Sequence, residues 1–228
     1  MAYTTLILGA SRGIGLELAR QSLAAGERVI ATARDDAGLE RLRALGCQPL
    51  RLDVTDPAST SGLAWQLEGE RIDTAWYVAG VMCSRADATQ PPTREAFDRV
   101  MHANVLGAMQ VIPQVAPLVE ASRAPGGGRF GFFSSVMGQI GTVGGSGAWL
   151  YRVSKAALNM AVASAPHSYP KATFVCFHPG WVQTDMGGAQ APVKPTDSAA
   201  GLRAALAATT PADSGAFLNY DGTRMGGW

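Results

Sequence analysis

The stretch Leu8-Gly9-Ala10-Ser11-Arg12-Gly13-Ile14-Gly15 decides the fold of this 228-residue chain. It follows a short apolar run at 3–8 and leads directly into a segment with helical spacing at 16–25. Gly9 permits a tight turn, while Gly13 and Gly15 remove side chains where backbone must approach a pyrophosphate and where helix meets sheet. The N–H groups and dipole at the helix start attract phosphates. The stretch predicts a dinucleotide site; the alternative is a glycine-rich turn without a ligand.

The rest of the chain continues this alternation of apolar runs and amphipathic segments. The spacing predicts strands at 3–8, 28–33, 49–54, 72–78, 129–134, 172–177 and 215–220, and helices at 16–25, 39–45, 57–68, 93–121, 151–164 and 197–208. Pro113 and Pro117 are expected to bend or interrupt the long helix. We therefore expect a Rossmann-type, doubly wound α/β fold: a parallel sheet of about seven strands with helices on both faces. One domain would span residues 1–228, with substrate loops at 138–150 and 181–196.

Composition excludes several classes of protein. With 47% hydrophobic and 16% charged residues the chain is not disordered, and a net charge of +1 gives no electrostatic case for a nucleic acid or membrane partner. No apolar run is long enough to span a membrane. Three cysteines without a CxxC spacing, and first residues unlike a signal peptide, predict a cytoplasmic chain. The scattered histidines, at 102, 167 and 178, predict no metal site.

Tyr151 and Lys155 form a YxxxK pair on one helical face. An ammonium near a phenol lowers the pKa of the phenol, which is a way to make a general acid/base. Alone the pair could be ordinary surface neighbours. Ser134 and Ser135, however, end a strand at the edge where parallel sheets bind ligands, so a serine hydroxyl could hold a substrate carbonyl; the alternative is strand-end capping. Asn104 is unexpected in the middle of a helix, and an exposed or core-bonded amide is the alternative to a functional one.

The glycine stretch, Asn104, Ser135 and the Tyr151–Lys155 pair, in this order along the chain, resemble the motifs of the short-chain dehydrogenase/reductase family. The stretches YRVSKAALNM at 151–160, HPGWVQTDMGG at 178–188 and YDG at 220–222 look closest to its C-factor-like branch. The resemblance implies reversible hydride transfer between a nicotinamide and a carbonyl or alcohol carbon. Ser135 would hold the carbonyl oxygen, Tyr151 would deliver the proton, Lys155 would lower the Tyr151 pKa and bind the nicotinamide ribose, and Asn104 would hold a water. The cofactor residues it implies are Gly9, Ser11, Arg12, Gly13, Ile14, Gly15, Asp53, Val54, Ala79, Gly80, Pro179, Gly180, Val182 and Thr184, besides Tyr151 and Lys155.

Two departures from the family stand out. Tyr77-Val78-Ala79-Gly80 occupies the place of the usual NNAG, for which we expect altered packing of the sheet rather than lost binding. Ser135 and Tyr151 are 16 positions apart, more than is usual, and the extra length falls in the loop 138–150.

The end of the second strand bears on the choice of nicotinamide. Ala33 stands where an acid would bind the ribose of NAD, and Arg34 follows it. Arg34 and Arg12 could clamp a 2′-phosphate, so we expect NADP(H) to be preferred over NAD(H). Asp35 or Asp36 turning inward would favour the opposite choice.

The functional hypothesis is a carbonyl reductase that uses NADPH to reduce small ketones or aldehydes. The alternative is a cofactor-binding regulatory or signalling protein with little turnover; an extended epimerase would need a longer chain. The apolar side chains of Trp149, Trp181 and Met186 suggest an apolar substrate; the alternative is that they pack within the protein and contact no substrate. The helices around Asn104 and Tyr151 could pair subunits into a homodimer or homotetramer.

Overall fold

The computed structural model describes residues 3–83 and 85–228, and its strands form one parallel sheet. The strands are β1 (Thr4–Leu8), β2 (Arg28–Ala33), β3 (Gln48–Arg51), β4 (Thr74–Tyr77), β5 (Gly128–Phe133), β6 (Ala172–His178) and β7 (Ala216–Asn219). They lie in the order β3-β2-β1-β4-β5-β6-β7, all parallel. The predicted seven-stranded doubly wound sheet is confirmed.

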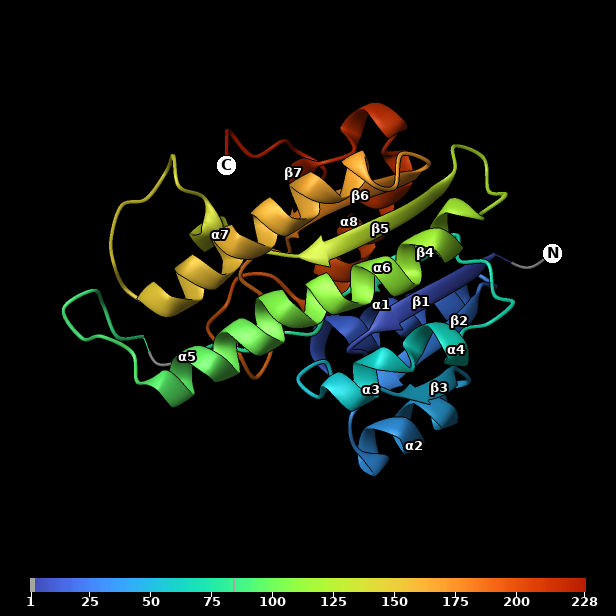
Figure 1. Cartoon of the computed structure of the whole chain (residues 1–228), viewed down its shortest axis with the longest axis horizontal. Coiled ribbons are helices and arrows are strands. Elements are labelled where there is room, and N and C mark those ends of the chain that lie inside the picture. The colour runs from blue at the N-terminus through green and yellow to red at the C-terminus, as the bar shows by residue number, and fades with distance from the viewer. Residues whose placement is uncertain (1–2, 84) are drawn as a thin grey trace.

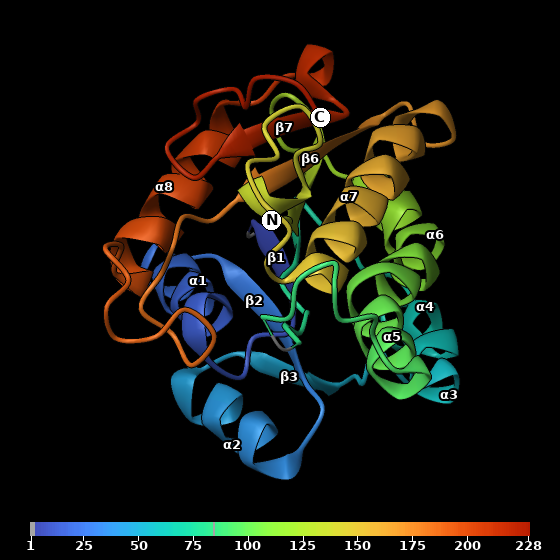
Figure 2. The same ribbon diagram turned by 90° about the vertical axis from the view of Figure 1, so that its left-hand side faces the viewer.

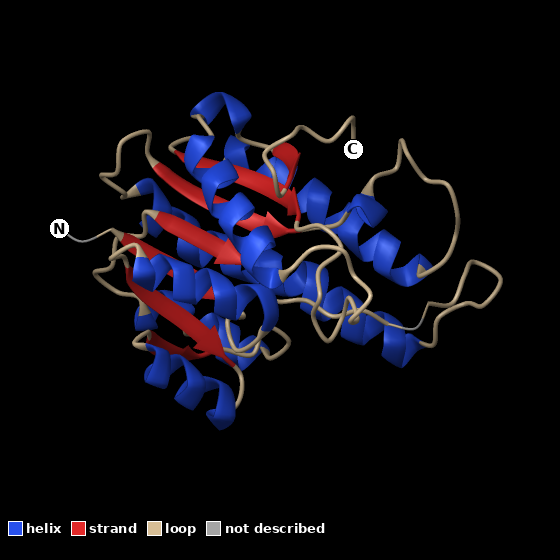
Figure 3. Ribbon diagram, turned by 180° about the vertical axis from the view of Figure 1, so that it is seen from behind, coloured by secondary structure: helices blue, strands red, loops and turns tan. Residues whose placement is uncertain are grey.

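The strand order reverses at β1, which pairs with β2 on one side and β4 on the other. Ligands bind at such a switch point, outside the carboxyl ends of the strands. Leu8, at the end of β1, lies in register with Tyr77, at the end of β4. The glycine stretch and the segment Val78–Gly80 therefore emerge side by side. Figure 3 shows the long loops gathered at this end of the sheet.

Helices cover both faces of the sheet (Figures 1 and 2). They are α1 (Gly13–Ala24), α2 (Asp36–Leu45), α3 (Pro57–Ser61), α4 (Leu63–Gln66), α5 (Arg94–Met101), α6 (Gly107–Glu120), α7 (Trp149–Ser164) and α8 (Pro195–Ala208). One apolar core joins the sheet to α1, α2 and α8, and the other joins it to α4, α6 and α7. This two-sided burial explains why the strands are apolar on both faces. No helix of the described residues is both long and apolar enough to cross a bilayer.

Two predicted helices differ from the structure. The segment expected at 57–68 is divided into α3 and α4 at Gly62, and the Asp56 side chain caps α3 by accepting from the Ala58 amide. The prolines at 113 and 117 do not end a helix, because α6 runs through both of them. Both prolines lie on the exposed side of α6, where water can reach the carbonyls that lose their N–H partner.

The long helix is interrupted instead at His102–Leu106, a π-helical turn between α5 and α6. Asn104 lies at its centre and is fully buried. A π-turn inserts one extra residue, which widens the helix and re-aims the side chains on it. The polar residue that looked out of place in a helix therefore sits where the helix is not regular.

Candidate active site

The glycine stretch forms a tight turn between β1 and α1. Gly9 has φ +94, and a Cβ there would lie 2.8 Å from the nitrogen of Ala79; a Cβ on Gly15 would collide with the carbonyl oxygen of Gly9. Gly13, with φ +56, faces Thr184. α1 begins here without a side-chain cap, so its first N–H groups remain available to an anion. The residues fit a pyrophosphate, because backbone and not side chain lines this turn. Ile14 packs inward against the core.

Tyr151, Lys155 and Ser135 meet at the carboxyl end of β5. Ser135 follows β5 and hydrogen-bonds with Tyr151, while the turn Val136–Gly138 packs so closely on α7 that a Cβ on Gly138 would lie 2.7 Å from the Lys155 backbone. Ser134 is engaged elsewhere, since its hydroxyl donates to Asn159 Oδ1 at 2.5 Å. The structure thus brings Ser135, and not its neighbour, to the tyrosine.

The electrostatics of the pair differ from the sequence-based expectation. Burial raises the pKa of Tyr151 to about 12, and the hydrogen bond with Ser135 offsets this only in part. Lys155 Nζ lies 5.6 Å from the centroid of the Tyr151 ring and donates to the carbonyl oxygen of Phe133 at 2.7 Å. Burial lowers the pKa of Lys155 to about 8, which Cys176 opposes. The expected lowering of the Tyr151 pKa is wrong for this structure, because desolvation outweighs the Ser135 hydrogen bond and the Lys155 ammonium is bonded to a backbone carbonyl instead.

Asn104 is held by three hydrogen bonds. Its Oδ1 accepts from the Val81 amide at 2.8 Å, and its Nδ2 donates to the Val81 carbonyl at 2.9 Å and to Ser154 Oγ at 2.9 Å. Gly80 separates it from the lysine: a Cβ on Gly80 would lie 3.1 Å from Asn104 Oδ1 and 3.5 Å from Lys155 Nζ. Asn104 and Lys155 therefore face one small space beside Gly80.

The remaining predicted cofactor residues border the same edge of the sheet. Asp53 accepts from Thr55 at 2.9 and 2.7 Å; burial raises its pKa, while the Thr55 bonds and the Arg34 charge lower it below its usual value. Val54 is buried in the core. On the far side, the Pro179 carbonyl accepts from Ser198, and Val182 is buried and bridges to Val193. The segment is further held by Gly180, with φ +85, and by Thr184, whose hydroxyl accepts from the Gly187 amide.

The two acids near Arg34 are both engaged outside the site. Asp35 caps α2 by accepting from the Gly38 amide at 2.8 Å, and Asp36 pairs with Arg51. Arg34 itself is exposed, and Arg12 pairs with Asp185 at 3.0 Å. Arg41, which the sequence reading missed, donates to the Ser11 carbonyl at 2.5 Å. Three arginines thus lie at the glycine turn, at the end of β2 and on α2.

The loop after Ser135 is held by the chain's last residues, 225–228, called here the C-terminal segment. Gln139 is buried and donates to the carbonyls of Gly226 at 3.1 Å and Gly227 at 2.9 Å. The amides of Ile140 and Gly141 donate to the Trp228 carbonyl at 3.0 and 3.1 Å. Sequence reasoning assigned this loop to the substrate pocket but did not foresee what supports it.

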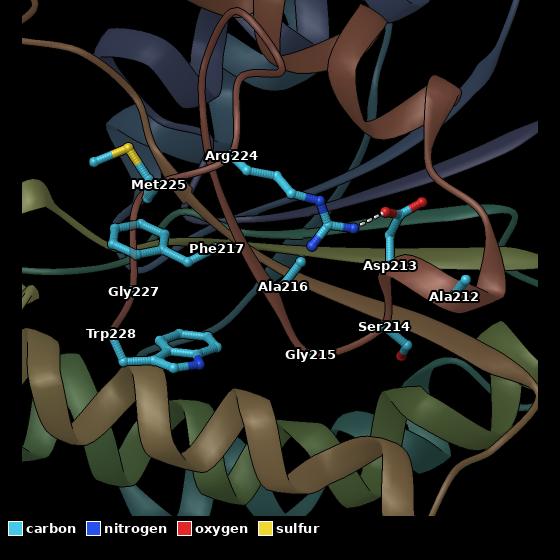
Figure 4. Close-up of a pocket in the computed structure, with 10 residues that line it drawn as sticks. All are labelled: Ala212, Asp213, Ser214, Gly215, Ala216, Phe217, Arg224, Met225, Gly227 and Trp228. Atoms are coloured by element: carbon cyan, nitrogen blue, oxygen red, sulfur yellow. Dashed lines mark hydrogen bonds and ion pairs between the residues drawn. The ribbon is translucent and has the colours of Figure 1, made fainter.

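A surface cavity of about 290 Å³ is lined in part by Met225, Gly227 and Trp228 of the C-terminal segment (Figure 4). The Arg224–Asp213 ion pair borders it, and Trp228 stacks on Phe217 at 5.9 Å. Neither Tyr151 nor Ser135 lines it. The cavity is thus separate from the cluster around the tyrosine.

His178, at the end of β6, carries a buried Nδ1 without a hydrogen-bond partner. Burial lowers its pKa to about 4 from the usual 6.5. Between these pH values His178 binds a proton in the unfolded chain but not in the folded chain. Its contribution to the free energy of unfolding is therefore fully present above pH 6.5 and is lost as the pH falls toward 4. We expect the free energy of unfolding to drop by about 2 kcal/mol from this group between pH 7.5 and pH 5.

Urea titrations of His178→Asn at the two pH values check this prediction. The variant should lose that part of the pH dependence, whereas His167→Asn, at an exposed position, should keep it. Equal pH dependence in the wild type and His178→Asn would contradict it.

Comparison with known proteins gives a consistent set of relatives. Residues 3–194 match the protein family described as short chain dehydrogenase. A 1-hydroxy-2-glutathionyl-2-methyl-3-butene dehydrogenase from Rhodococcus sp. strain AD45 is 32% identical over 96% of this chain and 97% of its own. The C-signal protein of Myxococcus xanthus is 35% identical over 65% of this chain and 86% of its own. Among solved structures, the NADPH-bound carbonyl reductase from chicken fatty liver superposes with a TM-score of 0.87 at 30% identity, covering all of this chain and 99% of the other.

Proposed function

This chain belongs to the short-chain dehydrogenase/reductase family, and from that premise we propose which of its residues carry out hydride transfer. It is an NAD(P)-dependent oxidoreductase acting on carbonyl or alcohol substrates. We further propose that it reduces small ketones or aldehydes with NADPH. The observation that carries the proposal is the buried cluster of Tyr151, Ser135 and Lys155 at the sheet edge where the glycine turn opens.

The residues present fit a nicotinamide dinucleotide. The glycine turn presents backbone and uncapped amides, and Ala79 and Gly80 lie beside it. When bound, the nicotinamide supplies the hydride for the carbonyl carbon. The protein's part is to orient the substrate and to manage one proton.

In the proposed mechanism the proton comes from Tyr151. The Ser135 hydroxyl donates to the substrate carbonyl oxygen, and the phenol delivers its proton to that oxygen as charge develops there. With its pKa raised, Tyr151 carries the proton throughout the physiological range. Lys155 stabilises the phenolate that remains, and Asn104 borders the space through which the proton is replaced.

The test is loss of NADPH absorbance with a panel of ketones and aldehydes of increasing apolar size. We expect turnover, with preference for apolar carbonyls, because Trp149, Trp181 and Met186 are all partly exposed around the proposed substrate loops. Failure of every carbonyl with a folded enzyme that binds NADPH would contradict the proposed reduction.

A second candidate function is that of a cofactor-binding regulator. It is favoured by the similarity to the C-signal protein. A regulator needs no general acid, whereas the buried phenol of Tyr151 beside Ser135 supplies one, so the enzyme is preferred. Tight NADPH binding without turnover across the whole panel would favour the regulator.

Preference for NADP(H) is proposed from Arg34 and Arg12, with Arg41 as a third cation. Arg34→Ala should weaken NADPH binding about tenfold or more and leave NADH binding nearly unchanged, because a charge-assisted hydrogen bond to a 2′-phosphate is lost. Calorimetric titration with both dinucleotides measures this. Arg43→Ala removes an exposed arginine of α2 that pairs with Glu40, and is the matched control. An unchanged NADPH affinity in Arg34→Ala would overturn the preference.

The oligomeric state and the cellular location are proposed from fewer observations. Exposed apolar side chains lie along the α5–α6 and α7 region: Phe97, Leu106, Met109, Val153 and Met160. A homodimer or homotetramer through these helices would bury them, and light scattering on the purified protein decides its mass. Cys47 and Cys176 are buried free thiols, which is compatible with the cytoplasmic location we propose; cell fractionation tests it.

A further inference from the structure

Tyr77 is a buried tyrosine at the end of β4, outside the catalytic cluster. It stands at the departure from NNAG, where the sequence predicts altered packing. Its side chain has no exposed surface, and its ring stacks on Phe132 with centroids 6.0 Å apart. A phenylalanine would pack in the same way. The hydroxyl therefore needs a separate explanation, because a buried phenol without a partner costs stability.

The hydroxyl donates to the carbonyl oxygen of Ala103 at 3.0 Å. Ala103 lies inside the π-turn His102–Leu106, directly before Asn104. Burial raises the pKa of Tyr77 far above its usual value, so the group remains a neutral donor. The bond ties β4 to the one irregular turn of the long helix.

Gly107 allows this close approach. It is the first residue of α6, and a Cβ there would lie 2.6 Å from the Tyr77 hydroxyl and 2.8 Å from the carbonyl oxygen of Val54. A bulkier residue would push the turn away from the sheet. Tyr77 and Gly107 together set the distance between the π-turn and the ends of β3 and β4.

That distance determines where the Asn104 amide lies. The Ala103 carbonyl belongs to the peptide group completed by the nitrogen of Asn104, so its direction constrains the Asn104 backbone. From there Asn104 bonds both backbone groups of Val81 and the hydroxyl of Ser154, which donates in turn to the Tyr151 carbonyl at 2.8 Å. The Asn104 side-chain amide makes all three bonds to Val81 and Ser154, so a shift of the π-turn would break them together.

We propose that Tyr77 is a positioning residue, whose hydroxyl holds the π-turn at the height that keeps Asn104 against Val81 and Ser154, beside Lys155. The catalytic part of this inference rests on the proposed function. The structural part does not, because the Val81 amide reports the place of Asn104 whether or not the enzyme turns over.

The experiment compares Tyr77→Phe with Tyr3→Phe in the full chain. Tyr77→Phe removes one hydroxyl and keeps the ring on Phe132. Tyr3→Phe removes the hydroxyl that bonds Thr74 Oγ1 at 2.7 Å, at the start of β4, and so changes the same strand at the end far from the site.

Two quantities are measured on variants that urea unfolding shows to be folded. The hydrogen-exchange rate of the Val81 amide should rise about tenfold in Tyr77→Phe, beyond any change that its free energy of unfolding explains. The rate should be unchanged in Tyr3→Phe. In steady-state assays kcat should fall about five- to tenfold in Tyr77→Phe, with a shifted pH profile, while the KM for NADPH stays within about twofold.

Each outcome is decisive. Faster Val81 exchange with a lower kcat supports the proposal. Unchanged Val81 exchange in Tyr77→Phe overturns it, whatever the activity, and so does a kcat equal to that of Tyr3→Phe in an active enzyme. If the wild type reduces no carbonyl, the proposed function fails, while Val81 exchange still decides whether Tyr77 positions Asn104.

Discussion

Tyr151→Phe is expected to lose about 10²–10⁴-fold in kcat for carbonyl reduction, the usual contribution of a general acid. The substitution removes the hydroxyl that would deliver the proton and keeps an aromatic ring in the buried position. Because the phenol pKa is about 12, its proton is present at every assay pH. Ser135, its neighbour, is too weak an acid to replace it.

The control for Tyr151→Phe is Tyr169→Phe, which removes a hydroxyl from a tyrosine packed on Phe174. Both variants should unfold at nearly wild-type urea concentration and bind NADPH in a calorimeter. A Tyr151→Phe enzyme that retained turnover would show that the proton comes from elsewhere.

Gly15→Ala is expected to have the second large effect, on folding and on cofactor binding together. Gly15 lies in α1 without a positive φ, so alanine would ordinarily stabilise the helix by up to about 1 kcal/mol. Here the added Cβ would collide with the Gly9 carbonyl oxygen. We expect a net destabilisation of about 2–3 kcal/mol, and NADPH binding weakened about tenfold or more as the turn shifts its amides.

Gly62→Ala gives the matched comparison. Gly62 also has helical backbone, but its Cβ would meet only the end of the Gln66 side chain, at 3.7 Å. Urea unfolding should show it as stable as the wild type or more so. If Gly15→Ala behaved like Gly62→Ala in unfolding and in NADPH titration, close packing of the turn would not be what requires glycine.

The parts of the fold that could be predicted are those set by local pattern. Apolar runs separated by helical periodicity predicted the strand and helix order, and the glycine stretch Gly9–Gly15 was correctly expected to form a tight turn between the first strand and the first helix. The position of Ser135 at a strand end and the Tyr151–Lys155 spacing brought these three residues together as expected.

The remaining features depend on contacts that spacing does not encode. A π-turn has the same residue pattern as an α-helix, so Asn104 signalled only that something was unusual there. Arg41 reaches Ser11, and Gln139 reaches Gly226, across about 30 and 90 positions of the chain respectively. The Tyr151 pKa was misjudged because burial, which raises it and outweighs the hydrogen bond with Ser135, is a property of the folded environment.

The contact between the C-terminal segment and Gln139 has a practical consequence for making the recombinant enzyme. An affinity tag fused after Trp228 would start within hydrogen-bonding reach of the loop that follows Ser135, and could alter measured selectivity without unfolding anything. A tag placed ahead of β1 avoids this, because Thr4 begins β1 at the amino ends of the parallel strands, whereas Ser135 follows the carboxyl end of β5.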